Sequence, residues 1–309
     1  MRIAFFGTPE FAVPTLRALA ATDHTLAVFT QPDRPVGRKA VLTPPPVKDA
    51  ALALGLPVYQ FEKIRSAEGC AAIRAFAPDL YAVVAFGQLF SQENLSIPPL
   101  GAVNVHGSLL PLYRGASPMQ QSVIDGQRVV GVSTMKLVKR MDAGDILLQA
   151  ETPLGENETY GELSLRLAEL GADLFMKTLD ALERGALSPV PQDEDKATYC
   201  KMLSRDSGKI DITAPRQVVH DLIRGTNPWP GAYALLGDEK LKLWRTVFSD
   251  AEAPDGLPAG GLFGDAKRGL FLRCTDGALE ITELQAPGGK KLDGKAFLRG
   301  KSIVGSVLS

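Results

Sequence analysis

The chain has 309 residues, of which 45% are hydrophobic and 22% charged, a composition typical of a soluble globular protein. This length is long for one hydrophobic core and favours two domains. The formal net charge of −1 argues against a protein that is basic throughout, although a locally basic surface remains open. No apolar stretch approaches the roughly 20 residues that span a bilayer, and no signal-peptide pattern is seen, so we expect a cytoplasmic protein.

The cysteines and histidines do not form a recognisable site. Cys70, Cys200 and Cys274 are widely separated and lack CxxC spacing, so we expect three reduced thiols. The three histidines match no metal-ligand spacing, and no metal is predicted. The absence of a GxGxxG fingerprint and of a GxxxxGK[ST] phosphate loop disfavours NAD and ATP chemistry.

The first half of the chain alternates short apolar runs with helical patterns. The runs lie at residues 2–7, 25–30, 79–87, 101–107 and 129–138. They are rich in Val, Phe and Ala, as are strands of a parallel sheet that is buried on both faces. A helical leucine repeat spans 163–182, and Thr159 and Glu162 before it have the spacing of a capping box. The alternation predicts an open α/β sheet, in which ligands bind beyond the carboxyl ends of the strands.

The pattern changes after the long helix. Residues 188–208 are polar, unpatterned and proline-bearing at their start, which is typical of a linker. Farther on, short alternating runs predict a small β-barrel of the OB kind with one helix near 215–224. The TDG sequence between two of these runs predicts a hairpin. We therefore divide the chain into an α/β domain (1–189), a linker (190–206) and a C-terminal domain (207–309).

The stretch GAVNVHGSLLPLYRG at 101–115 departs from the pattern of a core strand. Asn104, His106 and Ser108 recur at every second position, so a strand would direct all three to one face near its carboxyl end. An amide beside an imidazole suits the stabilisation of an oxyanion on a carbonyl under attack. The alternative is a polar edge strand with a hydrogen-bonded core histidine, and the spacing alone does not separate the two.

A second candidate is KRMDAGDILLQ at 139–149. Asp142 and Asp145 flank Gly144 at the end of an apolar strand, where a turn can project one carboxylate into the same cleft. A carboxylate beside a histidine can orient the ring or accept a proton, directly or through water. Taken alone, the pattern is more typical of an ordinary turn.

Together, NVHGSLLPLYRG and the later MDAGD resemble the folate-dependent formyltransferases, and within them those that formylate methionyl-tRNA. FFGTPEFAVPTL, FTQPDRPVGRK, NVHGSLLPLYRGASPMQ and NPWPGAY stand in the family's order, and the resemblance covers essentially the whole chain. It implies a Rossmann-like catalytic domain and an OB-like tRNA-binding domain. The implied reaction moves the formyl group of 10-formyltetrahydrofolate to the α-amino group of methionyl-initiator tRNA, for translation initiation. A monomer is expected.

The resemblance also implies a role for each residue of the motifs. Asn104 would donate to the formyl oxygen as it becomes an oxyanion, and His106 would stabilise the tetrahedral intermediate and take part in proton transfer. Asp142 would orient His106 and accept, through water, the proton lost by the attacking amine. Asp145 is left as structural. The implied folate site comprises Phe86, Gly87, Ser108, Leu109, Leu110 and Pro111.

Two further segments bear on the acceptor. The loop at 30–48 carries five prolines, which exclude a long helix or a central strand. Arg34, Arg38 and Lys39 make it locally basic, and the resemblance implies contact with the acceptor end of the tRNA; a solvated surface loop is the alternative. Trp229 lies between two prolines, where packing is preferred over stacking on RNA.

Other functions remain open from the sequence. The same motif would serve formylation of a small amine, such as an amino sugar nucleotide or a glycinamide ribonucleotide. The separate C-terminal β-domain and the basic loop favour a large RNA substrate instead. A non-catalytic folate- or RNA-binding module is also possible because fold does not fix function. The intact set of Asn104, His106 and Asp142 argues against that module.

Overall fold

The structure is a computed structural model that describes residues 1–37 and 40–309. The chain forms two compact units. The first consists of Met1–Pro118, Val130–Thr152 and Ser164–Cys200, and the second of Met119–Val129, Pro153–Leu163 and Lys201–Ser309. The units interleave in sequence because two short segments, Met119–Val129 and Pro153–Leu163, pack with the C-terminal part.

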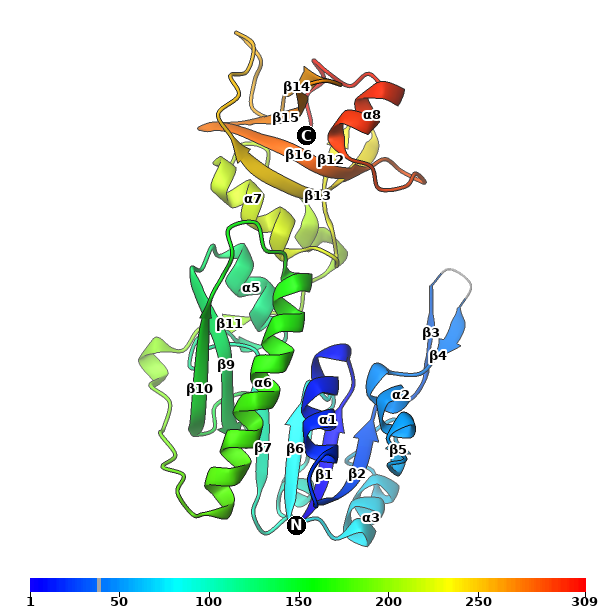
Figure 1. Cartoon of the computed structure of the whole chain (residues 1–309), viewed down its shortest axis with the longest axis vertical. Helices are drawn as coiled ribbons and strands as arrows, with labels where there is room; N and C mark the ends of the chain where they lie inside the picture. Colours follow the sequence, from blue (N-terminus) through cyan, green and yellow to red (C-terminus); the bar gives the residue numbers. More distant parts are fainter. Residues whose placement is uncertain (38–39) are drawn as a thin grey trace. The chain divides into compact units, whose positions relative to one another are not determined.

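The first unit is built on a seven-stranded sheet in the order β10–β9–β7–β6–β1–β2–β5 (Figure 1). Its strands are β1 (Arg2–Gly7), β2 (Thr25–Thr30), β5 (Val58–Gln60), β6 (Leu80–Val84), β7 (Ala102–His106), β9 (Val129–Lys136) and β10 (Ile146–Pro153). The five neighbouring strands β7, β6, β1, β2 and β5 are parallel to one another, and β9 is antiparallel to β7. This confirms the predicted open, mainly parallel α/β fold.

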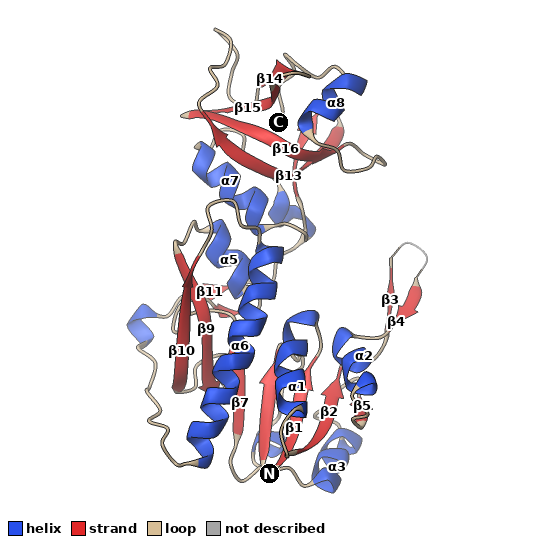
Figure 2. Cartoon of the chain, viewed as in Figure 1, coloured by secondary structure: helices blue, strands red, loops and turns tan. Residues whose placement is uncertain are grey.

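Helices cover both faces of this sheet, which explains the near-continuous apolar runs (Figure 2). They are α1 (Val13–Ala20), α2 (Pro46–Ala53), α3 (Ala67–Phe76), α4 (Gln92–Leu95) and α6 (Tyr160–Glu183), with short 3-10 turns at Glu10–Ala12 and Glu194–Lys196. On one face, Gly171 of α6 lies so close to Val105 that an added Cβ would be 3.0 Å from its methyl group. On the other face, Ile73 of α3 belongs to an apolar cluster with Phe6 of β1. Asn104 lies on the Phe6 face, because both residues pair with Val83 of β6.

The predicted capping box begins α6. The backbone N–H of Thr159 donates to the Glu162 carboxylate at 2.9 Å, and the N–H of Glu162 donates to the Thr159 hydroxyl at 3.3 Å. Each side chain thus satisfies a backbone donor that the helix leaves free at its first turn.

The second unit contains a five-stranded sheet in the order β12–β13–β16–β15–β14. Its elements are α5 (Pro118–Ile124), a 3-10 turn (Arg205–Gly208), α7 (Arg216–Gly225), β12 (Ala232–Leu236), β13 (Glu239–Ser249), β14 (Leu262–Asp265), β15 (Gly269–Cys274), β16 (Gly277–Gln285) and α8 (Gly294–Gly300). The pairing of Cys274 with Gly277 confirms the hairpin predicted from TDG.

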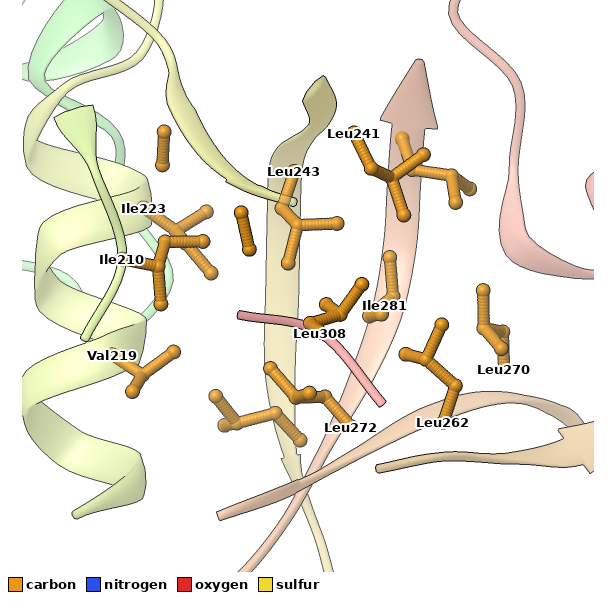
Figure 3. Close-up of a cluster of buried hydrophobic side chains, with 14 of the residues drawn as sticks. Ile210, Val219, Ile223, Leu241, Leu243, Leu262, Leu270, Leu272, Ile281 and Leu308 are labelled. Carbon is orange, nitrogen blue, oxygen red and sulfur yellow. The ribbon is translucent and has the colours of Figure 1, made fainter. Parts of the chain in front are cut away.

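The C-terminal residues join the two edges of this sheet. Ser309 and Leu235, which belongs to β12, exchange two backbone hydrogen bonds of 2.7 and 2.9 Å. The N–H of Leu308 donates to the carbonyl of Gly260, which precedes β14, at 2.9 Å. The C-terminal segment therefore closes a small barrel, as predicted, around the apolar core in Figure 3, which includes Leu308 and Ile223 of α7.

Some general expectations can be compared with the structure directly. None of the three cysteines forms a disulfide, and all three are buried. No helix in the described part of the chain is both long and apolar enough to cross a membrane. Among the same residues, no group of three or more His, Cys, Asp or Glu side chains is placed to hold a metal ion.

Candidate active site

Asn104 and His106 lie on one face of β7 at its carboxyl end. Asn104 is opposite Met135 of β9, and His106 is opposite Ser133. The strand ends at His106, so Ser108 lies in the following bend and is outside the alternation that the sequence predicted. The predicted alternation on one strand face is therefore correct for Asn104 and His106 but not for Ser108.

The side chain of Asn104 is buried but unpaired. The residue is 9% exposed, and its amide makes no hydrogen bond with any residue that the structure describes. The fully buried polar atoms without a partner among the described residues are the Thr15 and Thr30 hydroxyl oxygens, so the Asn104 amide is in part accessible. An amide left without a protein partner at the carboxyl edge of an α/β sheet is therefore available to a bound molecule.

The ring of His106 is held by two different oxygens. Its Nε2 is 2.9 Å from the carbonyl oxygen of Tyr113, which can only accept, so Nε2 carries a proton. Its Nδ1 is 3.8 Å from Oδ1 of Asp142. That distance is too long for a direct hydrogen bond. This places the Asp142 carboxylate next to the imidazole without a direct hydrogen bond.

Asp142 reaches His106 from a tight turn between β9 and β10. Its Oδ2 accepts a hydrogen bond of 2.8 Å from the backbone N–H of Gly115, which leaves Oδ1 toward the imidazole. Asp142 has a positive φ of 47°, a conformation that Asp tolerates better than most residues. Gly144 is required in this turn because a Cβ there would lie 1.9 Å from the Lys136 carbonyl oxygen. The MDAGD pattern is thus a turn that brings Asp142 to His106.

Asp145 belongs to a different contact. Its carboxylate accepts from Nζ of Lys136 at 3.2 Å, and its carbonyl accepts from the Lys136 backbone N–H at 2.9 Å. Both contacts fasten the turn to β9. They are consistent with the structural role assigned to Asp145 from the sequence.

The bend after β7 is fastened by its own side chains and by β9. The Ser108 hydroxyl donates to the Leu112 carbonyl at 2.6 Å, so this hydroxyl is used within the bend. The Ser133 hydroxyl donates to the Ser108 carbonyl at 2.7 Å and accepts from the Leu110 N–H at 3.0 Å. These bonds fix the course of the backbone that contains Ser108, Leu109, Leu110 and Pro111, the residues of the expected folate site.

The loop after β6 is also fixed. Phe86 packs its ring against Phe6 at a centroid distance of 5.2 Å, and its carbonyl accepts from the Thr8 hydroxyl at 2.8 Å. The carbonyl of Gly87 accepts from the Gln31 amide at 3.0 Å. Since β6 and β7 are parallel neighbours, this loop and the bend after β7 follow the same edge of the sheet.

The basic loop forms a small hairpin of its own. Its strands are β3 (Arg34–Val36) and β4 (Val41–Thr43), and every residue of both is exposed. This agrees with the expected lack of a long helix or a central strand. The Arg34 guanidinium donates to Glu62 at 2.6 Å. Arg38 and Lys39 lie outside the described residues, so contact of this loop with tRNA stays a prediction.

Trp229 in the second unit is only partly packed. Trp229 is 49% exposed. The neighbouring Asn227 is buried, and its amide donates to the Trp244 carbonyl at 2.7 Å. The segment is therefore anchored next to the tryptophan, while about half of Trp229 faces solvent.

Two residues near the site were missed from the sequence. Arg114 has an exposure of 0%, and its guanidinium bonds to Gln192, Glu194 and Tyr199. The signal for Arg114 in the sequence is its position as the one charge in the otherwise apolar LLPLYRG. Gln192 donates to the carbonyls of Asp142 and Gly144, and nothing in its polar surroundings marks it.

Comparison with known proteins identifies the family. A family model described as formyl transferase matches residues 1–179, and one described as formyl transferase, C-terminal domain, matches residues 202–302. The chain is 44% identical to a methionyl-tRNA formyltransferase of Trichlorobacter lovleyi, over 99% of this chain and 96% of the relative. It is also 44% identical to one of Moorella thermoacetica, over 100% and 99%.

Solved structures with the same fold are more distant in sequence. An N-formyltransferase of Helicobacter canadensis, in complex with folinic acid and dTDP-3-aminofucose, superimposes with a TM-score of 0.69 at 16% identity, over 94% of this chain and 100% of the other. The sugar 3N-formyltransferase WlaRD gives a TM-score of 0.68 at 16% identity, over 93% and 97%. At this identity the likeness concerns the fold alone. From the family models and the close relatives, the chain belongs to the formyltransferase family, among the methionyl-tRNA formyltransferases.

Proposed function

We propose that this protein transfers the formyl group of 10-formyltetrahydrofolate to the α-amino group of methionyl-initiator tRNA. Its close relatives carry the name methionyl-tRNA formyltransferase over nearly their whole length. The product would be N-formylmethionyl-tRNA for translation initiation. A cytoplasmic location and a monomeric state belong to the same proposal.

The observation that carries the proposal is the unpaired amide of Asn104 beside His106. The amide is nearly buried, and no described residue accepts or donates a hydrogen bond to it. A preorganised donor of this kind can bind an oxygen on which negative charge develops. His106 and Asp142 next to it supply the groups that acyl transfer to an amine also needs, because the attacking amine must lose a proton.

The reaction proceeds by direct attack. The amine nitrogen forms a bond to the formyl carbon, whose oxygen becomes an oxyanion held by the Asn104 amide. A proton on Nδ1 of His106, facing the Asp142 carboxylate, would give the ring a positive charge that also stabilises this oxyanion. The proton released by the amine passes through water to Asp142. The bond between the formyl carbon and the folate nitrogen then breaks, and that nitrogen takes up a proton.

The folate donor fits along the carboxyl edge of β6 and β7. Phe86 and Gly87 follow β6, and the bend from Ser108 to Pro111 follows β7. Both backbones are fixed by hydrogen bonds within the unit, so they offer a preformed edge next to Asn104. Open α/β sheets bind their ligands at such an edge. The side chains that contact the folate rings remain a prediction.

The proposed acceptor is a charged tRNA. The exposed hairpin with Arg34, and the neighbouring Arg38 and Lys39, would contact its phosphates or its acceptor end. The C-terminal barrel supplies a second surface in a fold that often binds oligonucleotides. Formylation of a small amine, such as an amino sugar nucleotide, needs neither part and is not favoured by the close relatives.

The test is an assay of formyl transfer from 10-formyltetrahydrofolate. Wild-type protein and Asp142→Asn are each given methionyl-initiator tRNA, and, in separate reactions, an amino sugar nucleotide. We expect the wild type to formylate the tRNA only, and Asp142→Asn to lose most of that activity. Formylation of the amino sugar nucleotide with inert tRNA would overturn the assignment of the acceptor. Full activity of Asp142→Asn would overturn the assignment of the site.

A further inference from the structure

We propose that Gln192 is a positioning residue for Asp142, and that residues 190–200, the brace, hold the two loops of the active site together. This inference rests on the proposed function, because it assigns these residues a part in formyl transfer. Residues 190–200 belong to the first unit, together with β7 and the turn that carries Asp142.

Gln192 holds the Asp142 turn through hydrogen bonds to its backbone. Its Nε2 donates to the carbonyl of Asp142 at 2.8 Å and to the carbonyl of Gly144 at 2.7 Å. Its Oε1 accepts from Nε of Arg114 at 3.0 Å. A guanidinium only donates and a carbonyl only accepts, so these partners allow one orientation of the amide. Gln192 is therefore a fixed link between Arg114 and the turn.

Arg114 is itself immobilised. Its guanidinium meets both carboxylate oxygens of Glu194, at 2.9 and 3.1 Å, and the Tyr199 hydroxyl at 3.1 Å. Paired contacts of this kind fix the plane of a guanidinium, which a lysine ammonium could not reproduce. Glu194 also accepts from Arg140 at 2.6 Å, and Arg140 begins the approach to the Asp142 turn. The brace thus contacts this turn on both sides.

The C-terminal end of the brace is bonded to the second loop of the active site, the bend that follows β7. The Tyr113 N–H donates to the Thr198 hydroxyl at 2.8 Å, and the Arg114 N–H donates to the Thr198 carbonyl at 2.9 Å. The short strand β8 (Arg114–Gly115) pairs with β11 (Tyr199–Cys200). Gly115 is required here because a Cβ would lie 2.2 Å from the Cys200 carbonyl oxygen.

These two ends meet at the catalytic pair. The Tyr113 carbonyl accepts from Nε2 of His106, and the Gly115 N–H donates to the Asp142 carboxylate. The backbone of Asp142 is held at the same time by Gln192. These hydrogen bonds, together with the peptide bond between Arg114 and Gly115, form a closed ring from Asp142 through Gln192, Arg114 and Gly115 back to Asp142. Each protein anchor of the His106–Asp142 pair is fixed by the brace.

The turn needs this support because its own conformation is unfavourable. Asp142 lies in the left-handed region with a φ of 47°, and the preceding Met141 is 60% exposed, so the Met141 side chain does little to hold this conformation. Without the two donors of Gln192 we expect the turn to relax and the carboxylate to leave its place beside His106. A displacement of about 1 Å can lower turnover by about 100-fold without a change in substrate binding.

The test compares Gln192→Ala and Gln192→Glu with Asp142→Asn in the full-length enzyme. Gln192→Glu keeps an acceptor for Arg114 but replaces the amide donors by an oxygen that the two carbonyls repel. We expect kcat to fall by about 100-fold in both variants, with little change in KM for either substrate. We also expect the pH profile of kcat to change toward that of Asp142→Asn, since the same carboxylate is withdrawn from His106.

Thr178→Val is the matched control for a general loss of stability. The Thr178 hydroxyl contacts Thr134 of β9 at 2.8 Å and donates to the Leu174 carbonyl, so it is another buried polar group of this unit. Thr134 alternates with Ser133 and faces away from His106. This variant should lower the Tm and leave kcat and its pH profile unchanged.

The outcomes separate the proposals. Wild-type kcat and pH profile in both Gln192 variants, with Asp142→Asn inactive, would overturn the brace and leave the proposed function standing. A fall in kcat with an unchanged pH profile, matched by Thr178→Val, would reduce Gln192 to a structural residue and also overturn the inference. If the wild type transferred no formyl group to tRNA, the proposed function itself would fail.

Discussion

In each of the two units, one side chain donates hydrogen bonds to two backbone carbonyls of a turn, but the two turns have different roles. In the first, Gln192 donates to the carbonyls of Asp142 and Gly144. In the second, the guanidinium of Arg224 donates to the carbonyls of Gly155 and Glu158, at 3.1 and 3.3 Å. Each side chain fixes a turn through the turn's backbone carbonyls. The first turn carries a candidate catalytic carboxylate, whereas the second lies just before the capping box of α6.

The comparison shows that a buried arginine does not mark a functional site by itself. Arg114 and Arg224 are 0% and 5% exposed, and each is paired with a carboxylate. The two arginines differ in the groups to which their hydrogen bonds lead. Arg114 acts through Gln192 on the turn that carries Asp142, whereas Arg224 bonds to Asp221, Gly155 and Glu158, which all belong to the barrel unit. Loss of the first should affect turnover, and loss of the second should affect stability.

The largest expected effect is that of Arg224→Ala. The substitution leaves the Asp221 carboxylate, which is 2.6 Å from Nε of Arg224 and 2% exposed, without its countercharge. Breaking a buried pair in this way costs about 3–5 kcal/mol of unfolding free energy. Urea unfolding measures this loss, and single-turnover formylation at low temperature should show an unchanged rate for the folded fraction. A large fall in that rate would break the contrast between the two units.

Asn104→Ala should have the opposite effect, a loss of turnover without a loss of stability. The amide makes no hydrogen bond within the described protein, so its removal should leave the Tm unchanged. Removal of an oxyanion donor lowers kcat by about 10²–10³-fold, or roughly 2.7–4 kcal/mol. Thermal unfolding and steady-state formylation on saturating substrates measure the two effects. A lowered Tm with near-normal kcat would make Asn104 a structural residue and remove the main support for the mechanism.

The smallest expected effect is a pH dependence in the second unit. Burial lowers the pKa of His220 below its ordinary value of 6.5, and the ring contacts Thr246 at 2.9 Å and the Glu156 carbonyl at 3.0 Å. The unfolded chain therefore takes up a proton more readily than the folded one. The stabilising contribution is present above pH 6.5 and decreases as the pH falls below that value.

Unfolding by urea between about pH 5 and pH 8, around the ordinary titration range of histidine, measures this contribution. His220→Gln provides the control, since it retains polar atoms and does not titrate in this range. The wild type should lose stability toward acid more steeply than the variant. Parallel curves for the two proteins would show that His220 does not link pH to the stability of the barrel unit.

The sequence by itself determined the features that depend on neighbouring residues. The apolar runs gave the strands of the first unit, because a strand buried on both faces must be apolar throughout. The spacing of Thr159 and Glu162 gave the start of α6, and TDG gave the turn between β15 and β16, since caps and tight turns are built from residues close in the chain. The family resemblance selected Asn104, His106 and Asp142, and the fold brings these three to one edge of the sheet.

Only the tertiary structure decided the contacts between distant segments. Gln192 meets the Asp142 turn from 50 residues away, and a polar stretch without periodicity gives no sign of such a partner. Ser309 closes the barrel against Leu235 through backbone groups that every residue possesses. The unpaired state of the Asn104 amide is likewise a property of its surroundings. Side-chain type limits which hydrogen bonds can form, but only the packing of remote segments decides which of them do.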